Sequence, residues 1–423
     1  MSPDNNQTGE LVDTGSLKIN VSNLMENFPV SDALVQISRT DTAAVIDELT
    51  TNASGQTPEI DLKTPPLDYS LDPSGGKPYS EYTLNVIANG FQPVIVEGVQ
   101  LLPASTALQN INMLQTGNIP VESPRSYLIG PHTLWGIFPP KIPESEVKEL
   151  PFPSGLVVLP QPVVPEFVVV HLGAPTDNSA QNVWVAFKDY IKNVASCEIY
   201  STWPVQSLRA NILAIISFTL NRVFSEWYRG KGFNFTITNS TAFDQSFMNG
   251  RNFYEDISTV VDDIFTTYVT RPNIFQPLLT QYCDGVRTQC VGRGMEQWGS
   301  KDLGDQGFDA LSILRIYYGS DVYLTNAEKV EGVPISYPGY TLQVGSTGEP
   351  VRTIQQQLNA ISNNYPAIAK QRVDGVYGEN TADVVRIFQE VFNLPVTGVV
   401  DFATWYAISN IYVAVTGIAG PIL

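Results

Sequence analysis

Hydrophobic and polar residues alternate along the first quarter of the chain, with the period of two that half-buried β-strands require. The alternation is clearest in the segments LKINVS, ALVQIS, YTLNVIA and VIVEGVQLL. Turn sequences separate these segments, notably at Asn52–Gly55 and Asp72–Gly76. The pattern predicts an all-β sandwich over residues 12–116, with its acidic side chains scattered over solvated faces and without a catalytic group.

Proline dominates the next stretch, because eleven of the thirty prolines lie between Pro120 and Pro165. Proline fixes φ and removes a backbone donor, so this stretch cannot propagate a helix or hold a central strand. We expect a stiff, exposed connector over residues 117–165, of the kind that proteases cut. Two side chains in its first half, His132 and Trp135, are expected to pack against a neighbouring part of the molecule.

A helical period replaces the alternation between residues 190 and 231. It predicts a short amphipathic helix that ends near Glu198, a tight break, and one long apolar helix. Thr202 is the expected N-cap of the second helix, and Pro204 falls in its first turn, where a missing N–H costs nothing. Gly230 is expected to close that helix.

Short strands and further helices surround this pair, which favours a mixed α/β or α+β domain over residues 166–330. A buried strand at Phe167–Leu172 opens the domain, and helices are predicted at Tyr254–Tyr268 and near Phe308–Tyr318. His171 in the strand is interpreted as a satisfied structural histidine.

Three helical patterns follow within residues 338–423, at Val351–Ile361, Thr381–Val391 and Phe402–Ile411. Two turns of one design precede the second and third helices, each with a glycine at the reversal and a polar cap. The chain as a whole is therefore predicted to be multidomain and α+β.

The acidic balance of the chain restricts its partners. There are 42 Asp and Glu against 24 Lys and Arg, a formal net charge of −18, which argues against nucleic acid or an anionic membrane. We see no secretory signal and no stretch of apolar residues long enough for a membrane span. Three cysteines are too few for a disulfide scaffold in a chain of this length. The two histidines are too few, and too far apart in sequence, to favour a His-rich metal site or a Ser/His or Cys/His catalytic pair.

Glu198 is the main candidate for chemistry. It lies between Cys197 and Ile199, with Trp203 five residues on. A carboxyl group in apolar surroundings is pushed toward its neutral form, which would make Glu198 a proton donor. The alternative is a glutamate at a helix end that faces water, and the residue pattern alone leaves both open.

The C-terminal segment resembles the three-helix peptidoglycan-binding domain. The matching residues are Gly345, Gly348, Val351, Leu358, Asp374-Gly375, Tyr377-Gly378, Thr381, Val385, Phe388-Gln389, Leu394, Gly398, Asp401 and Thr404-Trp405. The resemblance implies a wall anchor in which Asp374, Tyr377 and Trp405 contact the ligand, although most matching residues would also build the fold.

Residues 167–325 resemble the SpoIID domain, a family of peptidoglycan lytic transglycosylases and amidase enhancers. The matching residues are Tyr190–Val194, Glu198, Trp203-Pro204, Leu208–Ala210, Gln281–Gly285, the loop Gly292–Gly299 and Leu314–Tyr318. The resemblance implies that Glu198 is the catalytic acid. It also implies substrate binding by Gln281, Tyr282, Asp284 and Gln297. Some relatives hold zinc with Cys and His, but this chain keeps only the cysteines, so we expect no metal and no cofactor; Cys283 and Cys290 are expected to be small buried residues or a late disulfide.

The order of the parts is similar to that of clostridial spore cortex-lytic enzymes. Residues 1–116 would be a removable pro-region, which itself resembles the carboxypeptidase-regulatory or transthyretin-like domain at Ala33–Val35, Thr51–Gly55 and Tyr82–Pro93. The resemblance implies a precursor stored in the spore, in the cortex or coat region, and made without a secretory signal. The oligomeric state is left open, with a monomer expected. It also implies activation by a serine protease during germination, with a cut in the connector near Leu156 and Val157.

The reaction that the resemblance implies is cleavage of the bond between N-acetylmuramic acid and N-acetylglucosamine by a single carboxyl group. Asp284 and Glu296 are candidates for a second carboxyl group if the enzyme is a hydrolase. Two rivals remain: an N-acetylmuramoyl amidase, which would want zinc and histidines, and a non-catalytic wall-binding protein or amidase enhancer.

Overall fold

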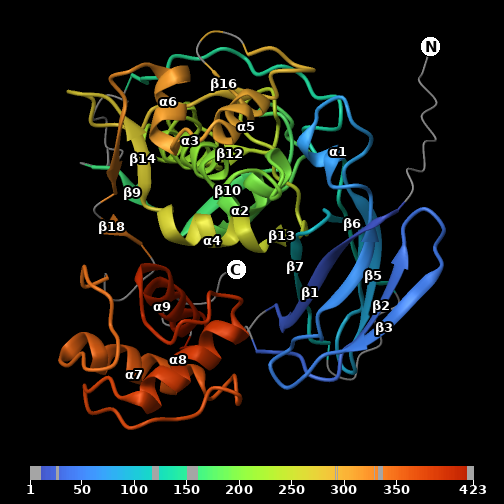
Figure 1. Ribbon diagram of the computed structural model, residues 1–423, viewed down its shortest axis with the longest axis vertical. Coiled ribbons are helices and arrows are strands. Elements are labelled where there is room, and N and C mark those ends of the chain that lie inside the picture. The colour runs from blue at the N-terminus through green and yellow to red at the C-terminus, as the bar shows by residue number, and fades with distance from the viewer. Residues whose placement is uncertain are drawn as a thin grey trace.

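The computed structural model describes residues 11–416, except 25–27, 117–122, 150–160, 291, 293, 328 and 332–336. Figure 1 shows a β-rich N-terminal part in blue, a central part of helices and short strands in green to orange, and a red C-terminal group of helices. The multidomain mixture of α and β structure is as predicted. No helix among the described residues is long and apolar enough to cross a membrane.

Two sheets make up the N-terminal part, and their strands follow the alternation in the sequence. The first sheet contains β1 (Asp13–Asn23), β4 (Ile60–Thr64) and β7 (Thr106–Met113). The second contains β2 (Leu34–Arg39), β3 (Val45–Thr50), β5 (Ser80–Ile87), β6 (Val94–Leu101) and β8 (Arg125–Leu128), and a short helix α1 (Asp68–Leu71) connects β4 to β5. Leu17, Ile19 and Val21 of β1 are buried while the residues between them are partly exposed, as a period of two requires.

The central part is built around one long buried helix, α3. Its helices are α2 (Phe187–Glu198), α3 (Val205–Phe224), α4 (Glu255–Ile264), α5 (Gln297–Asp305) and α6 (Ala310–Tyr318), with a 3₁₀ turn at Arg229–Lys231. Its strands are β9 (Val163–Val164), β10 (Phe167–His171), β11 (Asn182–Ala186), β12 (Ile237–Thr238), β13 (Phe253–Tyr254), β14 (Thr267–Thr270), β15 (Tyr282–Cys283), β16 (Met295–Glu296), β17 (Tyr323–Asn326) and β18 (Lys329–Val330).

The ends of α3 differ from the prediction. The helix begins at Val205 with Pro204 as its N-cap, and the hydroxyl of Thr202 donates to Ser70 instead of capping the helix. At the other end α3 stops at Phe224, before Gly230, because the chain turns through Glu226 at a φ of 48°.

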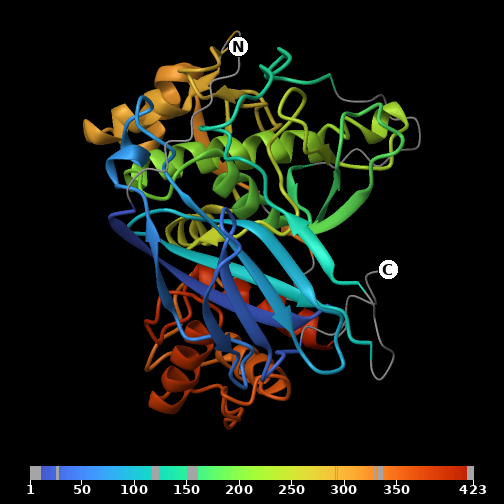
Figure 2. The same cartoon turned by 90° about the vertical axis from the view of Figure 1, so that its right-hand side faces the viewer.

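One strand of the central part joins the N-terminal sheet. In that sheet the order is β13-β7-β1-β4, and β13 pairs antiparallel with β7 through Phe253 opposite Leu108 and Tyr254 opposite Ala107. Figures 1 and 2 show the β-rich part flanking both the central part and the C-terminal helices. The two parts therefore share backbone hydrogen bonds as well as side-chain contacts.

Residues 131–149 of the connector, which we name the strap, lie against the central part. The prediction of an exposed connector is wrong for part of the strap, because His132, Leu134 and Lys148 are buried, whereas Ile137 and Ile142 are exposed. Proline prevents regular structure here but does not prevent burial, since the backbone groups bond to other elements: the Ile142 N–H donates to the Ala242 carbonyl at 2.7 Å. The predicted cut near Leu156 and Val157 lies outside the described residues.

The C-terminal helices are α7 (Glu349–Ile361), α8 (Glu379–Val391) and α9 (Phe402–Thr416), close to the predicted bounds. Helix α9 packs against the end of α4 through the C-cap residue Phe265, whose ring centre lies 5.4 Å from that of Phe402 and 5.2 Å from that of Tyr406. The side chain of Gln56 donates to the carbonyl of Val391 at 2.9 Å. The C-terminal helices thus contact both other parts.

Candidate active site

Helix α2 ends at Glu198, and distant segments satisfy its last carbonyl groups. A helix leaves its final carbonyls without intrahelical partners. Here Arg251 donates to the carbonyl of Ser196, the N–H and hydroxyl of Thr133 donate to that of Cys197 at 3.1 and 2.8 Å, and Gln297 donates to that of Glu198 at 2.9 Å. The backbone at Glu198 is therefore held by groups from the strap, the segment before β13, and α5.

The carboxylate of Glu198 is buried, with 4% of the residue exposed, and four donors surround it. Oε1 accepts from the Ser246 N–H at 2.9 Å and from the Tyr282 hydroxyl at 3.4 Å. Oε2 accepts from the hydroxyl of Thr133 at 3.1 Å and from the amide of Gln297 at 3.3 Å. Both alternatives of the sequence analysis are thereby corrected: Glu198 does not face water, and its surroundings are hydrogen-bond donors rather than apolar groups.

Lys141 of the strap brings a positive charge to this site. Its ammonium lies 4.6 Å from the centre of the Tyr282 ring and donates to the carbonyl of Asp244. Burial lowers the pKa of Lys141, and the charges of Glu198 and Asp244 oppose that effect. The strap thus contributes both a hydroxyl and a cation to the surroundings of Glu198.

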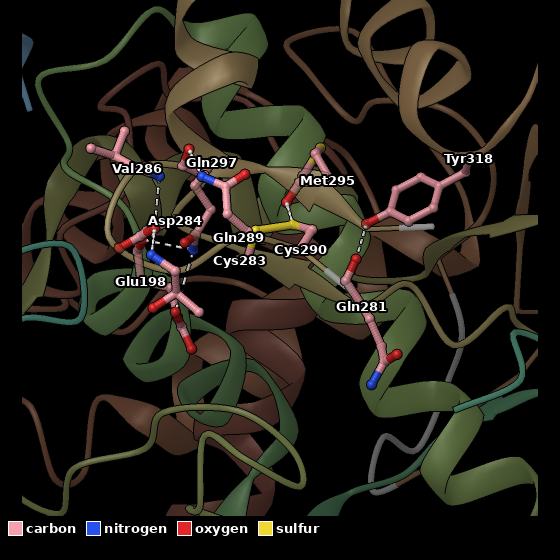
Figure 3. Close-up of a disulfide and its surroundings, with 12 residues drawn as sticks. Glu198, Gln281, Cys283, Asp284, Val286, Gln289, Cys290, Met295, Gln297 and Tyr318 are labelled. Carbon is pink, nitrogen blue, oxygen red and sulfur yellow. Dashed lines mark hydrogen bonds between the residues drawn. A yellow bond between two sulfur atoms is a disulfide. The ribbon is translucent and has the colours of Figure 1, made fainter. Parts of the chain in front are cut away.

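Two of the four predicted substrate-binding residues meet at Glu198, namely Tyr282 and Gln297. The other two do not. Gln281 points away from Glu198 in Figure 3 and bonds the strap, donating to the Ile142 carbonyl at 2.7 Å and accepting from the Glu144 N–H at 3.2 Å. Asp284 instead stabilises its own turn, because its carboxylate accepts from the Val286 and Thr288 N–H groups at 2.9 and 2.7 Å.

Cys283 and Cys290 form a disulfide beside the site, which is one of the two expectations for them. The loop that it closes carries Arg287, whose guanidinium donates to the strap carbonyl of Leu134 and lies 5.3 Å from the centre of the Trp135 ring. No cluster of three or more His, Cys, Asp or Glu side chains that could hold a metal ion occurs in the described part of the chain.

The strap covers the break after Glu198 as well. His132 packs on Tyr200 with ring centres 4.4 Å apart, which confirms that it packs against a neighbouring part. Burial and the charge of Arg251 hold the pKa of His132 well below its usual value. From the N-terminal part, the Ser70 carbonyl accepts from the Trp203 indole at 3.0 Å. The break after Glu198 is therefore covered by the strap and by the N-terminal part.

Sequence reasoning missed Thr133, Lys141 and Ser246. The first two lie in a connector that was expected to be exposed, and Ser246 acts through its backbone N–H, which any residue could supply. No pattern of residue types along the chain marks such contacts, because they join segments 48 and 65 residues from Glu198.

The three predicted wall contacts are placed differently from one another. Tyr377 and Trp405 are each 1% exposed, and the Tyr377 hydroxyl donates to the Gly398 carbonyl at 3.0 Å. Neither presents a ring face to solvent, so their expected role is corrected to building the domain core. Asp374 is at the surface, and hydrogen bonds from the Val376 N–H and Gln355 lower the pKa of its carboxyl group.

Comparisons with known proteins identify the C-terminal part. The family described as "Putative peptidoglycan binding domain" matches residues 347–408, which confirms the expected domain and supports peptidoglycan as a binding partner. No curated protein matches the chain.

Several solved structures are similar to short stretches of this chain. The TIE protein of Bacillus anthracis is 16% identical, with a TM-score of 0.18 over 24% of this chain and 17% of that one. The SleB N-terminal domain is 33% identical, with a TM-score of 0.15 over 17% of this chain and 93% of that domain. GBS52, the minor pilin of Streptococcus agalactiae, is 15% identical, with a TM-score of 0.18 over 26% and 48%. The chain thus spans 17% of the length of the TIE protein and about half of the pilin.

Proposed function

We propose that the chain is the inactive precursor of a spore cortex-lytic enzyme similar to the clostridial enzyme SleC, with Glu198 as its catalytic residue. Residues 166–330 would form the SpoIID-like catalytic domain and residues 338–423 the wall anchor. The observation that carries the proposal is the convergence of Tyr282, Gln297 and the Ser246 N–H on one buried carboxyl group. The peptidoglycan-binding family match at residues 347–408 supports the substrate class.

The proposed reaction is lytic transglycosylation. Once the Thr133 hydroxyl and Lys141 have left with the strap, Glu198 in its protonated form donates its proton to the oxygen that joins C1 of N-acetylmuramic acid to N-acetylglucosamine, and the C1–O bond breaks. The resulting carboxylate then takes the proton of the muramic acid O6 hydroxyl, and O6 bonds to C1 to close a 1,6-anhydro ring. Gln297 and Tyr282 hold the carboxyl group in place through both steps, and no water is consumed.

Occlusion by the strap supports the precursor state. A glycan cannot reach Glu198 while the hydroxyl of Thr133 occupies its Oε2 at 3.1 Å and Lys141 covers the Tyr282 ring. A cut by a serine protease between the strap and β9, near Leu156 and Val157, would leave the strap and the N-terminal part attached to the central part only by non-covalent contacts. Its departure with the N-terminal part would open the site.

The test is to incubate spore cortex with the processed protein and analyse the released muropeptides. Anhydro-muramic ends support the lyase, whereas reducing muramic ends would identify a hydrolase. Cleaved amide bonds would identify an amidase, and no release would leave a wall-binding protein. Sequencing the N-terminus of the active form locates the cut, and a cut after residue 200 would refute the assigned pro-region.

A further inference from the structure

A second buried site under the strap is built around Arg222 of α3. Its guanidinium holds the carboxylate of Glu144 with two hydrogen bonds, Nη2 to Oε1 at 2.6 Å and Nη1 to Oε2 at 3.0 Å. The Arg222 side chain is 0% exposed and that of Glu144 is 14% exposed. Arg222 also donates to Asp244 through Nε at 2.7 Å. Paired bonds of this kind are the geometry by which arginine recognises carboxylates.

The two carboxylates that neutralise Arg222 belong to different parts of the molecule. Asp244 lies in the central part, where it also accepts hydrogen bonds from Tyr228 and Thr238, and it stays with Arg222 after activation. Glu144 lies in the strap and would leave with it. Burial works to lower the pKa of Arg222, but the charges of Asp244 and Glu144 outweigh it and raise the pKa. Activation therefore removes one of the two carboxylates that bond Arg222, together with the strap cations Lys141 and Lys148 that interact with it, while Arg222 itself remains ionised.

After Glu144 has left, Arg222 still presents the pair of donors that bound the Glu144 carboxylate. Two guanidinium donors would then point into the space that the Glu144 carboxylate had filled, on the face that the strap no longer covers. A second carboxylate would restore the paired, charge-assisted bonds.

The Arg222 site and the Glu198 site are joined by one short segment of the chain. Asp244 binds Arg222 and the N–H of Ser246 binds Glu198, and these two residues are separated by one residue along the chain. Consecutive Cα atoms are about 3.8 Å apart, so the two backbone positions are at most ~8 Å apart. Lys141 joins the sites from the strap side, since it contacts the Asp244 carbonyl and the Tyr282 ring.

We propose that Arg222 of the activated protein binds a carboxylate of the wall polymer in the place that Glu144 occupies in the precursor. The inference rests on the proposed function, and it makes Glu144 an internal stand-in for the substrate anion. Muramic acid can supply this carboxylate from its lactyl group or from an attached peptide. Binding of this carboxylate by Arg222 would distinguish N-acetylmuramic acid from N-acetylglucosamine. It would also determine which glycosidic bond of the glycan is placed at Glu198.

The experiment uses the whole chain with a site-specific protease sequence placed within residues 150–160, so that cutting leaves both fragments present. The affinity between the fragments is measured by exchange with a labelled N-terminal fragment. Glu144→Gln should weaken it by about tenfold, since the amide cannot neutralise Arg222. The matched control is Glu146→Gln, because Glu146 is also a strap glutamate paired with an arginine, Arg271, at 2.8 Å. It should weaken the affinity by less than about threefold. Equal effects of the two variants would overturn the proposal.

Two pairs of ligands are compared. The first pair is the disaccharide of N-acetylglucosamine and N-acetylmuramic acid with its lactyl carboxylate free or amidated. The second pair is the same disaccharide carrying a peptide whose carboxylates are free or amidated. A free carboxylate should displace the N-terminal fragment at about tenfold lower concentration than the amide. The pair that shows this difference identifies the lactyl or peptide source. Displacement at the same concentration by free and amidated ligands in both pairs would refute the site.

Arg222→Lys should abolish the difference between free and amidated ligands, because lysine lacks the paired donors. Should that variant fail to fold, Glu144→Gln supplies the same test with Arg222 intact, and it should keep the difference while needing less ligand. The readout is binding and does not depend on product formation. A protein that shows the carboxylate preference but releases no muropeptides would refute the lyase and leave the Arg222 site standing.

Discussion

The hydroxyl of Thr133 lies 3.1 Å from Oε2 of Glu198 and 2.8 Å from the carbonyl of Cys197. A residue of the connector thus contacts both the side chain and the helix end of the candidate catalytic group. Thr133 is 9% exposed, so these bonds form away from solvent, where an unpaired acceptor is expensive. Thr133 thus links the strap, which is proposed to leave on activation, to the Glu198 carboxylate, which its departure would expose.

Thr133→Val should loosen the strap while preserving the shape of the side chain. The variant loses the hydroxyl that bonds Glu198 and Cys197, and we expect the uncut protein to lose about 1–3 kcal/mol of stability. Uncut protein should then release measurable muropeptides from cortex, unlike the unchanged precursor. Thr42→Val, at an exposed turn, is the control and should change neither property. Unaltered stability of Thr133→Val would show that this bond does not hold the strap.

Glu198→Gln should abolish muropeptide release from the processed protein, by at least about a hundredfold, because an amide cannot donate and recover the proton. Glutamine has nearly the same volume, so the fold and the binding of the C-terminal part to sedimented peptidoglycan should be retained. Both quantities are measured on one preparation. Full activity of the variant would remove Glu198 from the mechanism.

Acid should destabilise the precursor through His132. The imidazole is buried, with Nδ1 accepting from the Leu134 N–H at 3.2 Å and Nε2 facing the Ile199 carbonyl at 3.3 Å. Burial, with the charge of Arg251, holds its pKa well below 6.5. Below about pH 6.5 the unfolded chain takes up a proton that the folded chain refuses, so stability falls as pH falls, by at most about 1.4 kcal/mol per pH unit.

Denaturant unfolding between about pH 7.5 and about pH 5 measures this slope. His132→Phe, which has no titrating group, should be less stable at neutral pH because two polar partners lose their bonds, but it should show a smaller slope over the same range. An identical slope in the unchanged protein and in this variant would contradict the assignment to His132.

Gln389→Ala should strongly reduce the stability of the C-terminal part. Gln389 accepts from the N–H groups of Thr397 and Gly398 at 2.9 and 2.8 Å and donates to the Val399 carbonyl at 2.9 Å. The variant leaves these backbone groups unpaired, and we expect a loss of about 2–4 kcal/mol. Gln343→Ala in the same part, at an exposed side chain, is the control. Gln389→Ala should lower both the thermal unfolding temperature and the amount of protein that sediments with peptidoglycan, whereas Gln343→Ala should change neither.

The sequence by itself determined the elements whose burial follows a short-range period. The alternation in β1, the helical faces of α2 and α7 to α9, and the paired turns of the C-terminal part could all be predicted. The turns share one mechanism, since Gln355 bonds the N–H of Gly375 at 2.9 Å much as Gln389 bonds that of Gly398. Such patterns are local because a strand or helix buries one face at a fixed spacing.

Only the tertiary structure decided how the strap and Glu198 are related. Proline content predicts the absence of helix and strand, but burial of the strap depends on partners such as Arg222 and Gln281 that lie 78 and 139 residues away. The polar surroundings of Glu198 arise in the same way, because its donors come from four separate segments. Hydrogen bonds between distant segments leave no period in the sequence, and for that reason the pairing of Glu144 with Arg222 became visible only in the folded molecule.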